Sequence, residues 1–197
     1  MFSLAYPIED EIEVNGQKVP IHTAFDVVLR VLDVLQEPQL SETGKLRIIL
    51  QLFFGKETEF LGLSIEDQAS LFHQVFSMVV KQEEKKVSYD LQGNPLPEYE
   101  EDKKACYSLK EDAPYIYASF MQAYGIDLLE EQGKLHWFKF QALLSGLPED
   151  TKFRQVVAIR TWEKPSKSKN AHEKQMRELQ KIYALPDEEV DPWQTEE

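Results

Sequence analysis

The chain has 197 residues, of which 42% are hydrophobic and 11% aromatic, so it holds enough apolar material for a packed core and wholesale disorder is not expected. Its 35 Asp and Glu residues outnumber its 22 Lys and Arg residues, and the net charge of −13 opposes binding to DNA or to anionic membranes. Cys106 is the only cysteine, which excludes an intrachain disulfide, and the lack of a signal peptide or a long apolar stretch leads us to expect a cytosolic protein.

The first residues predict a short β-hairpin. Polar and apolar residues alternate over 11–14, and the Asn-Gly pair at 15–16 supplies the positive φ angles of a tight type I′ turn. The returning strand follows at 17–21. Pro20 marks an edge position or the end of this strand, because proline has no N–H to donate to a sheet.

Three amphipathic helices follow and complete a first module that we expect to span residues 1–82. Thr23 is the expected N-cap of the first helix, which ends before Pro38 because proline disfavours helical geometry in the residue ahead of it. A second helix is expected at 43–54. The third starts at Ser64, whose hydroxyl can cap the first turn.

The character of the sequence changes in residues 83–111. This segment is rich in Lys, Glu and Asp and contains a Gly-Asn-Pro-Leu-Pro run at 93–97. Such a composition is typical of a charged linker or an exposed excursion, and we predict one here.

An aromatic-rich helical module is expected at 112–165. Asp112 is the predicted N-cap of its first helix, which ends at Gly125. A second helix is predicted over 134–144. Pro148 is expected to open a third helix at the first helical position, where proline is tolerated.

A final helix is predicted within residues 166–185, followed by an acidic tail at 186–197. An Asn-x-x-Glu pattern begins the helix at Asn170. Its narrow apolar face comprises Met176, Leu179, Ile182 and Tyr183. The fold class is therefore mainly α, with helical bundle-like modules and a short N-terminal β-hairpin.

The motifs that carry enzyme chemistry are missing, and we expect a protein without catalytic, cofactor or metal sites. The four histidines lack the spacing that places two ligands on one helical face, and neither a phosphate-binding loop nor a dinucleotide fingerprint occurs. His73 and His136 lie in apolar stretches and are expected to pack or to form hydrogen bonds. Cys106 is interpreted as a structural thiol, because a nucleophile needs a nearby base and an orienting group.

Three segments resemble a known family. They lie at 112–128, 133–140 and 144–151. Their most specific motifs are Tyr-Gly-Ile-Asp-Leu at 124–128 and Gly-Leu-Pro-Glu-Asp at 146–150. The sequence is similar here to the bacteriophage "Gp-fifteen" family, whose members are encoded just ahead of the tape measure gene. The likeness covers most of the chain.

The resemblance implies a tail assembly chaperone that binds the tape measure protein while the tail tube polymerises around it. It also implies the major tail tube protein as a second candidate partner, self-association into a ring or spiral, a location in the host bacterial cytoplasm and absence from the mature virion. No membrane, nucleic acid or cofactor is expected.

Large aromatic side chains supply the candidate partner-binding surface. A partner helix docks through apolar anchors at helical spacing, and aromatic and Met side chains provide large contact areas. The alternative is that these side chains form the core of the module, because large aromatics are mostly buried. The candidates are Tyr115, Tyr117, Phe120, Met121, Tyr124, Trp137, Phe138 and Phe140.

Basic residues are concentrated near the C-terminus, where nine of them stand against the three acids Glu163, Glu173 and Glu178. The nine are Lys152, Arg154, Arg160, Lys164, Lys167, Lys169, Lys174, Arg177 and Lys181. Opposite charges on neighbouring chains would favour head-to-tail association, and the alternative is a solvated helix face with internal ion pairs.

Three other functions are weighed against the chaperone. A structural head–tail connector or tail component of the virion is the main alternative. A hydrolase using Cys106 and a histidine lacks the required constellation. A DNA mimic would favour one dense acidic face, whereas acids and bases are interspersed here.

Overall fold

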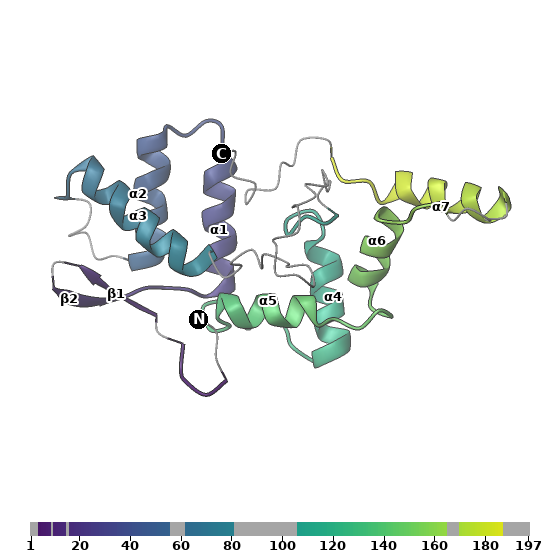
Figure 1. Ribbon diagram of the computed structural model, residues 1–197, viewed down its shortest axis with the longest axis horizontal. Coiled ribbons are helices and arrows are strands. Elements are labelled where there is room, and N and C mark those ends of the chain that lie inside the picture. Colours follow the sequence, from purple (N-terminus) through teal and green to yellow (C-terminus); the bar gives the residue numbers. More distant parts are fainter. Residues whose placement is uncertain are drawn as a thin grey trace, which may run out of the picture. The chain divides into compact units, whose positions relative to one another are not determined.

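The computed structural model describes residues 4–8, 10–14, 16–55, 62–80, 106–164 and 170–186. These residues form seven helices and one two-stranded antiparallel sheet (Figure 1), which confirms the predicted fold class. Most of the predicted linker at 83–111 and nearly all of the acidic tail at 186–197 lie outside the described residues. None of the described helices has the length and apolarity needed to cross a membrane.

Contacts divide the chain into two compact units. Unit 1 comprises Met1–Glu100 and Gln132–Phe140, and unit 2 comprises Glu101–Glu131 and Gln141–Glu197. The contacts thus assign residues 132–140 to the N-terminal unit, whereas the sequence places them within the aromatic module at 112–165. Residues 132–140 belong to the N-terminal unit because their backbone forms hydrogen bonds with residues at the start of the first helix.

The predicted hairpin is present in unit 1. Strand β1 (Glu11–Val14) pairs antiparallel with β2 (Gln17–Pro20), and Gly16 takes the positive φ of 78° that the turn requires. Pro20 ends the second strand opposite Glu11, as a residue without an N–H must lie at a strand end or edge.

Helices α1 (Phe25–Gln36), α2 (Glu42–Phe54) and α3 (Ile65–Val80) follow, close to their predicted bounds. Ser41 caps α2 by accepting a hydrogen bond from the backbone N–H of Gly44. Ser64 caps α3 as predicted, because its hydroxyl accepts from the backbone N–H of Asp67 at 3.1 Å.

Two predictions for this unit are wrong. Ala24, not Thr23, is the N-cap of α1, because the Thr23 hydroxyl donates to the Asp10 carboxylate at 2.7 Å. His73 is exposed on α3 and does not pack in the core. The core is formed by apolar side chains from the three helices, chiefly Val28, Val31, Ile49, Leu50, Phe53 and Val75.

Residues 132–140 join this unit through the start of α1. The backbone N–H of Phe25 donates to Leu135 O at 2.9 Å, and the N–H of Trp137 donates to Thr23 O at 2.8 Å. The Phe25 ring then stacks on Phe140 with ring centroids 5.0 Å apart. Helix α5 (Trp137–Ser145) therefore contributes its first four residues to unit 1 and the remainder to unit 2.

Unit 2 also contains α4 (Ala113–Tyr124), α6 (Lys152–Arg160) and α7 (Asn170–Ile182). The α4 helix ends at Gly125, which has the left-handed φ of 66°, as predicted. Helix α6 begins after Thr151 and not at Pro148. The buried Ser119 hydroxyl of α4 accepts a hydrogen bond from the backbone N–H of Phe153 at 3.0 Å, which ties α4 to the first turn of α6. Apolar side chains fill the core around this contact, among them Ile116, Phe120, Leu144, Leu147, Phe153 and Val156.

Candidate functional site

The eight aromatic and Met side chains expected to bind a partner fall into two groups. Four are buried in the cores, namely Phe120, Trp137, Phe138 and Phe140. The other four reach the surface of α4, namely Tyr115, Tyr117, Met121 and Tyr124. Only this second group is available to a partner without unfolding of a unit.

Tyr117, Met121 and Tyr124 form one stripe along α4, because they are spaced by four and three residues. The Met121 side chain is 43% exposed, and both tyrosines are half-buried. The Tyr124 hydroxyl donates to Leu143 O at 2.9 Å, so its ring is held in place while one side stays accessible. We call these three residues the α4 stripe.

A second hydroxyl contact fixes the other end of the α4 stripe. The Tyr117 hydroxyl donates to Asp127 at 3.1 Å, and this hydrogen bond to a carboxylate is the main reason that the pKa of Tyr117 is raised above its ordinary value. Asp127 also accepts from the backbone N–H of Leu129 at 2.9 Å, and the Leu129 side chain is highly exposed. Asp127 therefore ties the Tyr117 hydroxyl to the loop that follows α4.

Tyr115 contacts the C-terminal segment that follows α7. Its ring meets the Tyr183 ring edge-on, with centroids 6.2 Å apart. The Lys152 ammonium group donates to the Tyr183 hydroxyl at 2.7 Å and lies 4.5 Å from the centre of the Tyr183 ring. Such cation–π contacts add to a hydrogen bond and help to fix an aromatic side chain at a surface.

Helix α7 lies beside α6 (Figure 1) and satisfies the carbonyl groups at the end of that helix. The Gln180 side-chain amide donates to Trp162 O at 2.9 Å and to Arg160 O at 3.4 Å. The last carbonyls of an α-helix have no partner within the helix, so these bonds fill a vacant acceptor position. The His172 ring packs edge-on against Trp162.

An ion pair joins the first turn of α7 to the residues that follow α6. Lys164 contacts the Glu173 carboxylate at 2.7 Å, and Arg177 contacts the same carboxylate at 2.8 Å. The hydrogen bond from Lys164 is the main reason that the pKa of Glu173 is lowered below its ordinary value.

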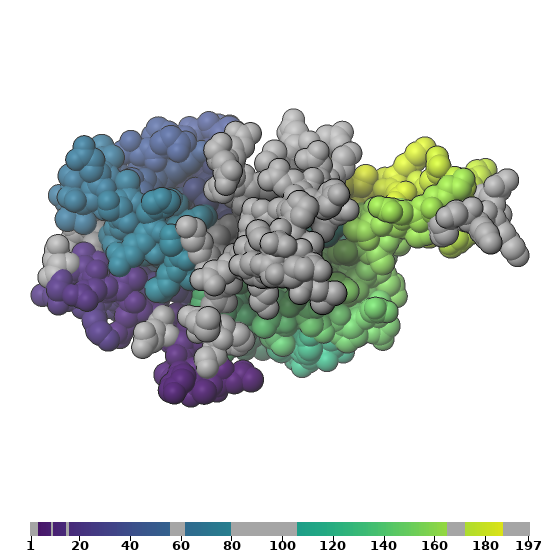
Figure 2. Space-filling model, in the orientation of Figure 1, coloured from purple at the N-terminus to yellow at the C-terminus, as the bar shows by residue number. Residues whose placement is uncertain are grey.

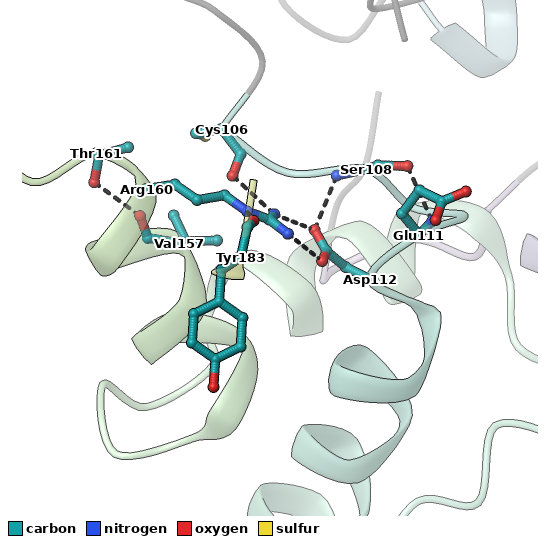
Figure 3. A network of polar contacts seen from close by, with 8 residues as sticks. All are labelled: Cys106, Ser108, Glu111, Asp112, Val157, Arg160, Thr161 and Tyr183. Carbon is teal, nitrogen blue, oxygen red and sulfur yellow. Dashed lines mark hydrogen bonds and ion pairs between the residues drawn. The ribbon is translucent and has the colours of Figure 1, made fainter. Parts of the chain in front are cut away.

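Unit 2 contains a buried network of polar contacts around Arg160 (Figure 3). Its guanidinium group binds both oxygens of Asp112, with Nη2 2.8 Å from Oδ1, and it also donates to the backbone carbonyls of Cys106 and Tyr183. The Ser108 backbone N–H donates to the same carboxylate at 3.0 Å. Arg160 thereby connects the start of α4, the end of α6 and the residue after α7.

The sequence did not indicate this network. Asp112 was predicted as an N-cap, and it occupies that position, but its side chain makes no capping bond because Arg160 and Ser108 engage the carboxylate. Arg160 lies 48 residues further along the chain, among other basic residues, and no local pattern distinguishes it.

Unit 1 contains a shallow polar pocket of about 180 Å³ next to Asp10, His22 and His136. His136 Nε2 lies 2.8 Å from Asp10, and Nδ1 accepts from the backbone N–H of Phe138, so both ring nitrogens have partners. The Thr23 hydroxyl bonds to Asp10 and not to His136, and this differs from a catalytic relay, in which the histidine must receive the hydroxyl proton. We assign the histidine to the start of α5, whose first turn it caps.

The described residues contain no group of three His, Cys, Asp or Glu side chains placed to hold a metal ion. Cys106 is partly exposed, and its backbone carbonyl, not its thiol, takes part in the Arg160 network.

Comparison with known proteins gives one result. The family model described as Bacteriophage Gp15 protein matches residues 7–185, which is most of the chain and includes both units. No curated protein and no solved structure matches the chain.

Proposed function

Because the chain belongs to the Bacteriophage Gp15 protein family, and is thus a phage protein connected with structure or assembly, we propose that it is a tail assembly chaperone. In this role it binds the tape measure protein during tail assembly in the host cytoplasm and leaves before the virion is complete. Binding is reversible, and no bond of the partner is made or broken.

The α4 stripe is the observation that carries this proposal. A long tape measure protein is expected to expose amphipathic helices before the tail tube surrounds it, and such helices need a temporary apolar surface to stay soluble. Helix docking uses anchors at spacings of three and four residues, and Tyr117, Met121 and Tyr124 have this spacing with accessible side chains. Tethered hydroxyl groups keep the rings ordered, which lowers the entropy lost on binding.

Met121→Lys is expected to reduce, several-fold, the amount of soluble tape measure protein recovered when the two proteins are expressed together. Lysine places a hydrated charge at the centre of the α4 stripe, where a docked helix would have to desolvate it. The measurement is the tape measure protein in the soluble fraction, quantified against expression without this chain and with the unaltered chain.

Gln122→Lys is the matched control, because Gln122 is the next residue of α4 and is also exposed. It adds the same charge outside the α4 stripe and should leave the soluble yield unchanged. Both variants should show unaltered circular dichroism and thermal unfolding, since both positions are exposed. Equal yields with the two variants would refute the α4 stripe as the docking surface.

A further inference from the structure

We propose that the helix docked on the α4 stripe is cationic, and that one of its Lys or Arg side chains binds at the Tyr117 end of the stripe beside Asp127 and Glu130. These two acids are here called the acidic edge. The inference rests on the proposed function, because it gives the charge of the partner that the same surface would select.

Helix α4 has no charged side chain of its own. Its 12 residues, Ala113–Tyr124, include neither an acid nor a base. The positions next to Met121 on the exposed side of the helix are Ala118 and Gln122, which are also neutral. In the space-filling view, teal atoms from α4 and the loop that follows it lie at the surface (Figure 2). A docked helix therefore meets a neutral surface along α4, and selection by charge must come from residues beside the helix.

The acidic edge supplies negative charge at one end of the α4 stripe. The Tyr117 hydroxyl donates to the Asp127 carboxylate at 3.1 Å. This hydrogen bond and burial raise the pKa of Tyr117, and the negative charges of Asp127 and Glu130 raise it further, so both carboxylates act on the hydroxyl. Glu130 is exposed, and Tyr117 and Asp127 are half-buried. A partner can therefore reach this end of the stripe from solvent.

The Asp127 carboxylate is held in place without being neutralised. One of its oxygens accepts from the backbone N–H groups of Leu129 at 2.9 Å and Glu130 at 3.4 Å, and the other accepts from Tyr117. All three donors are neutral, and an ionised carboxylate has about four acceptor positions. Asp127 thus keeps both its charge and room for a further donor, and its fixed position lowers the entropy lost when a cation binds.

A Lys or Arg side chain suits this end of the stripe for three reasons. Its charge is attracted by the acidic edge, its head group can lie against the face of the Tyr117 ring, and its aliphatic stem can cover apolar surface next to Met121. An acidic residue at the same place would be repelled by two carboxylates. The net charge of −13 adds attraction for a cationic partner over longer distances.

The test uses the full-length chain and two fluorescein-labelled model peptides. Both peptides are amphipathic helices with leucines at spacings of three and four residues and with glutamines on the polar face. One peptide carries lysines beside the leucine stripe, and the other carries glutamates at the same positions. Fluorescence anisotropy measures the affinity for each peptide at low and at high salt.

Three substitutions separate the acidic edge from the rest of the surface. Glu130→Lys reverses one charge of the acidic edge, and Glu163→Lys, at an exposed position after α6, is the matched control because it changes the net charge equally. Met121→Gln removes an apolar anchor without adding charge. Circular dichroism and thermal unfolding check each fold, and Glu130→Gln takes the place of Glu130→Lys if the reversed charge prevents folding.

We expect the unaltered chain to bind the lysine peptide several-fold more tightly than the glutamate peptide, with a difference that shrinks at high salt. Glu130→Lys should abolish this preference, Glu163→Lys should keep most of it, and Met121→Gln should weaken the binding of both peptides. Equal affinity of the unaltered chain for the two peptides, or an equal loss of preference in Glu130→Lys and Glu163→Lys, would overturn the charge requirement. Unchanged binding of both peptides by Met121→Gln would instead refute the α4 stripe as the docking surface.

Discussion

Arg160→Met will lower the free energy of unfolding by about 3–5 kcal/mol, the range observed when one partner of a buried ion pair is removed. The Asp112 side chain is 1% exposed, so without the guanidinium its negative charge would stay buried beside only the Ser108 N–H among the described contacts. The same substitution removes the donors to Cys106 O and Tyr183 O. Urea denaturation followed by circular dichroism measures the change.

Two further variants test whether the loss of stability comes from the unpaired buried charge of Asp112 or from the removal of an arginine side chain alone. Arg177→Ala breaks an exposed ion pair, whose arginine side chain is 65% exposed, and should cost at most about 0.5 kcal/mol. Combining Arg160→Met with Asp112→Leu removes both charges and should recover part of the lost stability. If Arg160→Met lowered the free energy of unfolding no more than Arg177→Ala does, the Arg160 network could not be a major source of stability for unit 2.

Trp137→Ala will destabilise unit 1 by about 3–5 kcal/mol, as expected for truncation of a large buried aromatic side chain. The Trp137 side chain is 1% exposed, and its ring stacks on Phe140 with centroids 5.6 Å apart. Its backbone also donates to Thr23 O, so the cavity would open where residues 132–140 join α1.

Trp137→Phe should cost much less, below about 1.5 kcal/mol, as for other substitutions that keep most of a core volume. Within the described part of the chain the buried Nε1 of Trp137 has no hydrogen-bond partner, so phenylalanine removes a donor whose burial is unfavourable. Lys139→Ala, at an exposed position of the same helix, is the control. Denaturation curves should show the largest loss of unfolding free energy for Trp137→Ala, a smaller loss for Trp137→Phe and the smallest for Lys139→Ala. An equal loss from the two Trp137 variants would contradict this packing.

The helices and the hairpin could be predicted from sequence because their signals are local. Apolar residues at helical spacing, the Asn-Gly turn and the glycine at position 125 act within a few residues. The errors at Thr23 and Pro148 have a different origin. Thr23 is a good capping residue whose side chain is engaged by Asp10, and Thr151 follows Pro148 as the actual N-cap. Asp112 is the N-cap as predicted, but its side chain binds Arg160, which lies far away in the sequence.

The candidate site was predictable only in part. The density of aromatic residues marked α4, but whether Phe120 or Met121 faces outward depends on where α6 packs, and this cannot be read from residue types alone. The histidines show the same limit. His136 is buried with both ring nitrogens bonded, as expected, whereas His73 lies on the exposed side of a similarly apolar helix.

The amount of this chain per tape measure protein, measured by quantitative mass spectrometry in tail assembly intermediates and in purified virions, tests the proposed function most directly. A chaperone that docks reversibly should be bound to the tape measure protein in the intermediates and depleted from the finished particle. A constant ratio in both would identify the chain as a structural component of the virion, and its absence from the intermediates would remove the tape measure protein as its partner.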